Sequence, residues 1–421
     1  MEITGKSELI NYLKEFTYSE TENHTLFPEL EKRTVVEEFI AGDCSVPVFT
    51  NEFWTSRQRQ PSSLHEISYR ACFKAQLPRF FIKLFTTEGD TVYDPFSGRG
   101  TTPVEAGLLN RQVVSNDISP LSKILASPRL KPPGMHEVSA RLEEIPVRKN
   151  LKADIDLSMF YHPDTEAEIC SLRAYLADKR GKGEEDILDS WIRMVATNRL
   201  TGHSPGFFSV YTLPPNQAVT QERQLKINKK RNQVPENKDT KKIIEKKTRS
   251  LIKGLSPHEA ENLGRARETA LFLEKDARQT PEIPHECVQL TITSPPFLDV
   301  VQYSSDNWLR CWFNNINTKD IEKKITMSRK IEDWVSVMGA VFEELYRITR
   351  SGGWVAFEVG EVKGGKVKLD EHVVPLGIKA GFSCEGILIN MQQFTKTSNI
   401  WGVSNNSRGT NTNRIVLFHK N

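Results

Sequence analysis

The chain has 421 residues, of which 38% are hydrophobic and 26% charged, and its formal net charge is +3. This length accommodates two domains of ordinary size, or one catalytic core with a large insertion. No run approaches the roughly 18 apolar residues of a membrane-spanning helix, and residues 1–16 lack the pattern of a signal peptide, so we expect a cytoplasmic protein with no membrane partner.

Residues 1–130 are predicted to contain a preamble and then the start of an α/β core. Residues 1–60 read as short helical and loop pieces, with amphipathic stretches at 11–16 and 35–40. An alternation of helix and strand follows, with elements expected at 77–85 (helix), 91–93 (strand), 103–109 (helix) and 113–117 (strand). This order is the beginning of a βαβ unit.

Residues 131–268 interrupt that alternation, and we interpret them as an inserted module of mainly helical and irregular structure. Within it, residues 223–253 hold twelve Lys or Arg and three acids, a net charge of +9, which leaves −6 for the rest of the chain. Such asymmetry is typical of an element that binds a polyanion. A solvated helical face followed by a mobile loop explains the pattern equally well.

The alternation resumes in residues 269–421, which we expect to complete the core. A buried strand is predicted at 288–293, a helix at 333–350 that stops at Gly352 and Gly353, and a strand at 354–359. Two short apolar runs at 386–390 and 414–420 suit a closing antiparallel pair. The expected fold is an α/β, Rossmann-like, doubly wound sheet with a terminal antiparallel hairpin and an inserted module.

A glycine-rich turn follows the first predicted strand, at residues 94–102. Gly98 and Gly100 let the backbone approach a ligand closely, and the helix that follows offers unpaired N–H groups, so a nucleotide-like cofactor fits there. Asp117 ends the next predicted strand, where a nucleotide-binding fold places an acid for ribose hydroxyls. A solvated strand-end cap is the alternative for Asp117.

A second turn, at residues 293–297, follows the buried strand. An amine conjugated to an aromatic ring is a poor nucleophile because its lone pair is delocalised. The hydroxyl of Ser294 and the main-chain carbonyl of Pro295 can accept hydrogen bonds from such an amine and localise that lone pair, while Pro295 and Pro296 keep the turn rigid. Phe297 offers a ring on which a flipped base can stack.

Together these turns resemble the amino-methyltransferase family of DNA modification enzymes, over about residues 64–130 and 270–421. The string 94–102 is similar to the family's motif I, although Arg99 stands where a small residue is usual, and the Ser-Pro-Pro-Phe turn is similar to its catalytic motif. Residues 64–82 look like the family's motif X. Asp276 lies in a string that resembles the family's Gly-Asp-Ala motif, in which the acid accepts a hydrogen bond from the adenine amino group of the cofactor, although Lys275 replaces the usual glycine. The resemblance implies a class I methyltransferase fold and S-adenosyl-L-methionine as the cofactor. The cofactor-binding residues that it implies are Asp94, Pro95, Phe96, Ser97, Gly98, Gly100, Thr101, Asp117 and Asp276, and the catalytic ones are Ser294, Pro295, Pro296 and Phe297.

The family's usual pattern also suggests the substrate. Enzymes that methylate cytosine N4 usually carry Ser-Pro-Pro, so Ser294 favours cytosine N4 over adenine N6, which is the alternative. The expected partner is double-stranded DNA with a flipped base, contacted by Lys226, Lys229, Lys230 and Arg231. A restriction endonuclease is a further candidate partner.

Other chemistries are less favoured by the sequence. The six cysteines show no metal-ligand spacing, so no metal site is expected, and none follows a proline, as the nucleophile of a cytosine C5 methyltransferase does. An RNA amino-methyltransferase and a non-catalytic regulator that binds cofactor or DNA remain alternatives.

Overall fold

The computed structural model describes residues 5–17, 33–42, 44–54, 62–70, 72–214, 217–296, 303–324, 330–362, 367–391 and 412–421. Within these residues the centre of the fold is a nine-stranded sheet in the order β1-β2-β10-β11-β7-β6-β3-β4-β5. Its strands are β1 (Val35–Ala41), β2 (Cys44–Asn51), β3 (Thr91–Asp94), β4 (Gln112–Asn116), β5 (Leu271–Leu273), β6 (Val288–Thr293), β7 (Thr349–Val359), β10 (Ser383–Met391) and β11 (Thr412–His419). A separate pair is formed by β8 (Glu361–Val362) and β9 (Val367–Lys368).

The strand directions confirm the expected doubly wound sheet with a closing antiparallel pair. Strands β5, β4, β3, β6 and β7 are parallel. Strand β11 runs antiparallel to both of its neighbours, β7 and β10. Strand β2 then extends the sheet parallel to β10, and β1 pairs antiparallel with β2.

The preamble and one helix end differ from the expectation. Residues 35–40 lie in strand β1 and not in a helical or loop piece, because β2 supplies a partner for this Val- and Ile-rich stretch. Helix α14 (Ile331–Ile348) ends before the glycines, and β7 begins at once at Thr349. Gly352, at φ +76°, lies within β7 and does not stop the helix.

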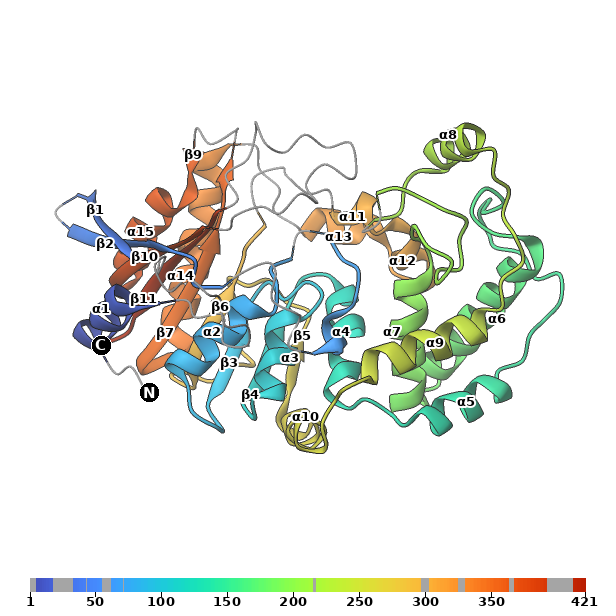
Figure 1. The fold of residues 1–421 in the computed structure, drawn as a ribbon, viewed down its shortest axis with the longest axis horizontal. Coiled ribbons are helices and arrows are strands. Elements are labelled where there is room, and N and C mark those ends of the chain that lie inside the picture. The colour runs from blue at the N-terminus through green and yellow to red at the C-terminus, as the bar shows by residue number, and fades with distance from the viewer. Residues whose placement is uncertain are drawn as a thin grey trace, which may run out of the picture.

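Helices cover both faces of the sheet (Figure 1). One face carries α2 (Gln76–Phe85) and α3 (Thr101–Leu108), and the other carries α14 and α15 (Leu369–Ala380). Strand β7 serves both faces because alternate side chains point to opposite sides of a strand. Trp354 and Ala356 belong to one apolar cluster, while Val355 and Phe357 belong to the other.

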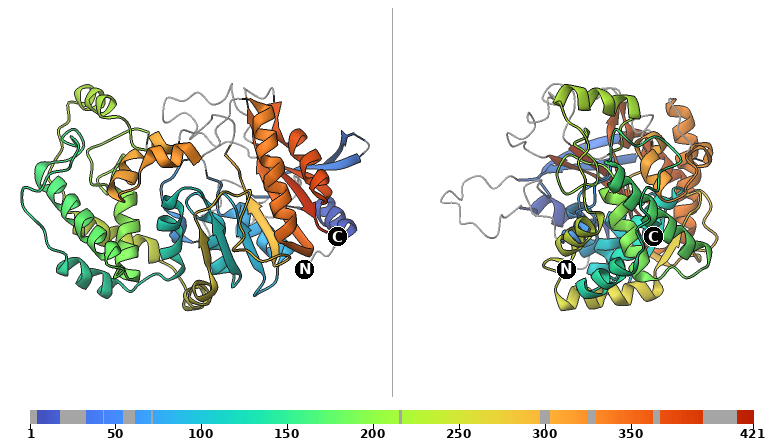
Figure 2. Two further views of the ribbon diagram at one scale, coloured as in Figure 1. Left: turned by 180° about the vertical axis from the view of Figure 1, so that it is seen from behind. Right: turned by 90° about the vertical axis from the view of Figure 1, so that its right-hand side faces the viewer.

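Between β4 and β5 the described chain forms only helices and connecting segments. These helices are α4 (Pro120–Ala126), η3 (Ser127–Leu130), α5 (Met135–Glu144), α6 (Pro163–Gly181), α7 (Ile187–Arg199), α8 (Gln221–Arg231), α9 (Thr240–Ile252) and α10 (Pro257–Thr269). Helices α5 to α9 lie beyond the β5 end of the sheet (Figures 1 and 2). Helix α10 packs against α3, η3 and β4, so it covers the sheet although its sequence lies in the predicted insertion. The boundaries at 131 and 268 stay predictions.

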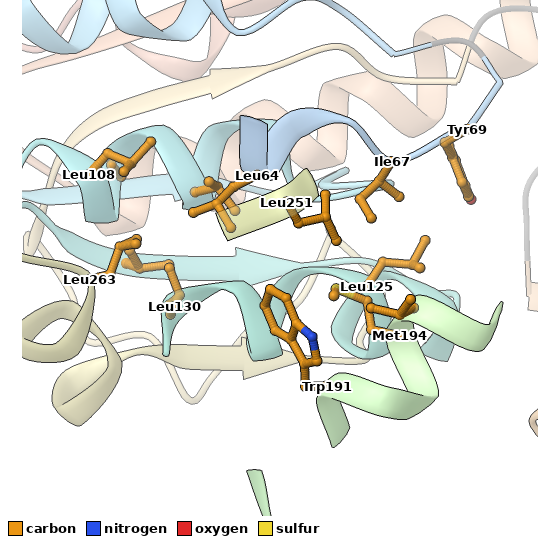
Figure 3. Packing of buried hydrophobic residues seen from close by; sticks show 14 of the residues in the cluster. Leu64, Ile67, Tyr69, Leu108, Leu125, Leu130, Trp191, Met194, Leu251 and Leu263 are labelled. Carbon is orange, nitrogen blue, oxygen red and sulfur yellow. The ribbon is translucent and has the colours of Figure 1, made fainter. Parts of the chain in front are cut away.

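One apolar core joins the insertion to the sheet. Figure 3 shows Trp191 and Met194 of α7 beside Leu125 and Leu130, which follow β4 in the chain, and Leu251 of α9 lies beside Leu64. Trp191 is fully buried, and its indole N–H donates to the Thr248 hydroxyl at 3.0 Å. The insertion is therefore fixed to the layer of helices around the glycine turn.

Short helices complete the described fold. They are α1 (Lys6–Glu15), η2 (Ser63–His65), α11 (Tyr303–Asp306), α12 (Trp308–Phe313) and α13 (Thr318–Lys324). None of the described helices is both long and apolar enough to cross a membrane.

Candidate functional site

A cavity at the carboxyl ends of the central strands brings the two predicted turns together. About 110 Å³ of it is accessible to a water-sized molecule, and its mouth is open to solvent. Among the residues that line it are Pro95, Phe96, Gly98, Asp117, Asp276, Ser294 and Pro296. Here α3, which follows β3, covers one face of the sheet, and α14, which lies between β6 and β7 in the chain, covers the other. Such a switch point is where open α/β sheets bind ligands.

The two glycines of the first turn have different structural roles. Gly98, at φ +51°, lines the cavity, and its N–H donates to Asp117 Oδ2 at 2.8 Å. Gly100, at φ +78°, packs against α4, and a Cβ there would lie 2.3 Å from the Cβ of Ala126. Gly98 therefore fits the predicted approach to a ligand, whereas Gly100 is required for close packing of the turn on a helix.

The two predicted cofactor acids both face the cavity but differ in their partners. Asp117 accepts hydrogen bonds from the main-chain N–H groups of Gly98 and Ser119, and burial raises its pKa to about 6. Asp276 is bound by Arg278, whose Nε and Nη2 donate to its two oxygens at 2.9 and 2.6 Å. That guanidinium lowers the pKa of Asp276, so an adenine amino group would share this carboxylate with Arg278.

Three other predicted cofactor residues lie behind the cavity wall. Asp94 is buried, and its Oδ1 accepts from the Thr293 hydroxyl at 2.7 Å and from the Phe96 N–H at 3.1 Å. These bonds join the end of β3 to the end of β6, and burial raises the pKa of Asp94 to about 7. Ser97 and Thr101 are also buried within the turn. All three side chains therefore support the turn from behind and do not line the cavity.

The second turn is held by residues that the sequence analysis did not identify. The indole N–H of Trp334, on α14, donates to the Pro296 carbonyl at 3.0 Å. Pro295 is buried, Ser294 is half-buried and lines the cavity, and Phe297 lies outside the described residues. Trp334 had no sequence signal beyond its place in an amphipathic helix.

Glu358 is the second missed residue, and it lies directly behind the second turn. It sits near the end of β7, is 7% exposed, and is hydrogen-bonded to the Ser294 hydroxyl. The Asn413 amide on β11 also donates to it. Burial raises the pKa of Glu358 to about 7. An acid inside the apolar strand 354–359 was a signal that could have found it, because carboxylates are seldom buried without a role.

The remaining cavity wall is largely apolar. Trp334, Val337, Met338 and Val341 line it from α14, and Tyr69 lines it from the segment before α2. An aromatic and aliphatic wall facing hydrogen-bonding groups is typical of a site for a planar heterocyclic ligand. In the described part of the chain no group of three or more His, Cys, Asp or Glu side chains could hold a metal ion.

The structure divides the basic segment 223–253 into two parts. On α8 the side chains of Arg223, Lys226, Lys229, Lys230 and Arg231 are exposed, and the Arg231 guanidinium lies 3.8 Å from the centre of the Tyr211 ring. In and before α9 several cations bind the protein itself: Lys238 donates to carbonyls of 207 and 209, Lys241 to that of 145, and Lys247 pairs with Glu66. Helix α8 and helix α11, which follows the second turn, lie on the same side of the molecule (Figures 1 and 2).

The strand order and the cavity define the class of protein. From β5 to β10 the strands follow the order 3-2-1-4-5-7-6 when numbered along the core, with strand 7 antiparallel. A glycine turn after strand 1 and an acid after strand 2 complete the class I methyltransferase fold.

Comparison with known proteins shows a similarity to DNA methyltransferases. Residues 16–124 match the family model described as DNA methylase, of the N6- and N4-methyltransferase group. The chain is 29% identical over 110 residues to the Type II methyltransferase M.BsoBI of Geobacillus stearothermophilus, which is 25% of this chain and 22% of that protein. It is 39% identical over 74 residues to the orphan methyltransferase M.BamHII of Bacillus amyloliquefaciens, 17% and 28% of the two chains. Over residues 16–124 the chain is therefore similar to the DNA amino-methyltransferase family, whose cofactor is S-adenosylmethionine.

These matches cover less than a third of either relative's length. Among solved structures, a TehB-like SAM-dependent methyltransferase from Corynebacterium glutamicum aligns over 82% of this chain and 87% of its own, with 7% identity and a TM-score of 0.29. The fold assignment therefore rests on the strand order and not on that alignment.

Proposed function

We propose that this protein is a DNA methyltransferase that transfers the methyl group of S-adenosylmethionine to an exocyclic amino nitrogen of a flipped base. The observation that carries the proposal is that one cavity is lined by residues of both predicted sites. Gly98 and Asp117, which follow β3 and β4, line it together with Ser294 and Pro296 of the second turn. A cofactor that contacts the first pair would present its reactive end to an amine that contacts the second pair.

The groups that line the cavity suit the chemistry of S-adenosylmethionine. The Asp117 carboxylate is fixed by two main-chain N–H groups and faces the cavity, as an acceptor for ribose hydroxyls should be. The apolar side chains of α14 offer a surface for an adenine ring. When bound, this cofactor supplies an electrophilic methyl group on a sulfonium sulfur.

The second turn provides acceptors for the target amine. Attack by the nitrogen lone pair forms the new N–C bond, the C–S bond breaks with its electron pair left on sulfur, and the nitrogen then loses a proton. Ser294 can accept a hydrogen bond from that N–H and pass its own hydroxyl proton to Glu358. A carboxyl group whose pKa is about 7 is well matched to accept a proton near neutral pH.

Within this chemistry we propose cytosine N4 as the target, because of the Ser-Pro-Pro turn at 294–296. Adenine N6 is the second candidate, since the same acceptors suit either exocyclic amine. For the DNA contact we propose α8, whose exposed Lys226, Lys229, Lys230 and Arg231 can contact phosphates. A restriction endonuclease remains a proposed partner.

The test is to incubate unmodified DNA with labelled S-adenosylmethionine and the protein, hydrolyse the DNA, and identify the labelled nucleoside. Label in N4-methylcytosine supports the proposal in full. Label in N6-methyladenine supports the reaction but overturns the choice of base, and label only in RNA supplied in parallel overturns the choice of nucleic acid. Binding of cofactor and DNA without any transfer would identify a regulator instead.

A further inference from the structure

Arg99, the residue that departs from the family's pattern in the first turn, is buried and directed away from the cavity. Its side chain is 8% exposed. The guanidinium donates to the carbonyls of Ile67 at 2.9 Å, Phe73 at 3.3 Å and His65 at 3.4 Å, and to the Thr101 hydroxyl at 3.1 Å. Three of its four acceptors thus belong to residues 65–70 and 72–73, which we call the wall segment.

The wall segment carries a side chain that shapes the cavity. Tyr69 lines the cavity, and a Cβ built on Gly98 would lie 3.6 Å from the Tyr69 ring. Tyr69 therefore faces the main chain of the glycine turn across the cofactor end of the cavity. Figure 3 shows Ile67 and Tyr69 following Leu64 along the edge of the apolar cluster.

No carboxylate compensates the charge of the buried Arg99 guanidinium in the described part of the chain. In the described part of the chain no carboxylate lies within ion-pair distance of Arg99 or of Arg129, which donates to the carbonyls of Arg99 and Leu64. Burying cations whose acceptors are all uncharged costs free energy. The planar fork of an arginine can reach several carbonyls at once, whereas the single ammonium group of a lysine cannot.

We propose that Arg99 is a positioning residue for the cofactor: it fixes the wall segment so that Tyr69 closes the cavity over the glycine turn. This inference rests on the proposed function, in which the cavity binds S-adenosylmethionine. Arg99 touches neither cofactor nor substrate in this arrangement. Its effect on cofactor affinity therefore passes through Tyr69.

The test compares Arg99→Lys, Tyr69→Leu and the double variant by calorimetry with S-adenosylmethionine and with S-adenosylhomocysteine. We expect Arg99→Lys to weaken both ligands about tenfold in the wild-type background and less than about threefold in the Tyr69→Leu background, because coupled residues give non-additive effects. Single turnover at saturating cofactor should stay within about threefold of wild type, which separates positioning from chemistry.

Arg111→Lys is the matched control. Arg111 also donates to main-chain carbonyls, that of Thr86 among them, and to the Thr86 hydroxyl. None of its hydrogen-bond partners lines the cavity. A loss of cofactor affinity in Arg111→Lys equal to that in Arg99→Lys overturns the proposal, as do additive effects of the Arg99 and Tyr69 substitutions.

Hydrogen exchange on the wild-type protein keeps the proposal testable if Arg99→Lys does not fold. S-adenosylmethionine should slow exchange of the amides in the wall segment, and unchanged exchange there, with protection elsewhere in the cavity, overturns the inference alone. A wild-type protein that fails to bind S-adenosylmethionine overturns the proposed function itself.

Discussion

Ser294 lines the cavity and is hydrogen-bonded to the buried carboxyl group of Glu358, so in the proposed reaction its hydroxyl connects the substrate to the proton acceptor. Ser294→Ala removes one acceptor for the amine and interrupts the path to Glu358. We expect the methyl-transfer rate to fall about 100-fold, with cofactor and DNA affinity changed less than about threefold. Single-turnover and binding measurements would separate these effects, and full turnover in the variant would exclude the serine from the chemistry.

The rate of methyl transfer should depend on pH because of Glu358. Because the proposed acceptor is the carboxylate and its pKa is about 7, the single-turnover rate of the wild type should rise with pH through about 7 at saturating cofactor. Glu358→Gln keeps the shape but cannot accept the proton, so its rate should be about 100-fold lower and nearly flat over that range. A Gln variant that retains the wild-type profile would assign the titration to another group.

Gly98 and Asp117 give a prediction about binding. Gly98→Val should abolish measurable cofactor binding because φ is +51° at a cavity-lining position, and Asp117→Ala should weaken it about tenfold or more without unfolding the protein. Gly89→Val is the control, since Gly89 has φ +84° and no neighbour within 4 Å. Calorimetry measures the cofactor affinity of both variants. If Gly89→Val loses as much affinity as Gly98→Val, the loss comes from backbone strain and not from the cavity.

At the scale of elements, the central strands and both turns were predictable because each has a local signal. The β-rich run at 91–93 precedes the glycine turn, the apolar run at 288–293 precedes the proline turn, and 113–117 begins with two valines and ends at an acid; the structure has strands at all three places. Strand β1 was missed because its stability comes from pairing with β2, which is not a local property. Trp334 was missed for the same reason, since its partner Pro296 lies about 40 residues away. Glu358 did have a local signal, the acid within the apolar strand 354–359, but its bond to Ser294 was not evident from the sequence.

Helix α8 is the element that we expect to hold DNA. Neutralising Lys229, Lys230 and Arg231 removes up to three charges that can bind phosphates, so DNA affinity should fall across sequences. The slope of log K against log salt should flatten by about 0.9 for each phosphate that is no longer neutralised. Neutralising Lys242, Lys246 and Arg249 on α9 changes the net charge equally and serves as the control. Equal losses of affinity in both triple variants would mean that general charge, and not α8, attracts the DNA.

At the scale of the whole molecule, the cofactor edge of the sheet collects three buried acids whose pKa values are raised: Asp94 and Glu358 to about 7 and Asp117 to about 6. Each lies on or directly after a strand of the central sheet. Burial of a carboxyl group disfavours its charged form, so the ligand-free fold holds protons at this edge that an unfolded chain would release.

This arrangement predicts how the stability of the ligand-free protein depends on pH. Between about pH 4.5 and 7 the folded state binds more protons at Glu358 than the unfolded state does, so this group's contribution falls as pH rises and is lost above about pH 7. Glu358→Gln removes that penalty. The free energy of unfolding of this variant relative to wild type should therefore rise by up to roughly 3 kcal/mol from pH 5 to about pH 7 and then level off, and its relative melting temperature should follow. Thermal unfolding of both proteins at matched ionic strength measures the difference directly. A difference that is independent of pH would mean that Glu358 is already ionised in the folded protein at pH 5, and the proton-accepting role of this carboxylate would then have to operate with a normal pKa.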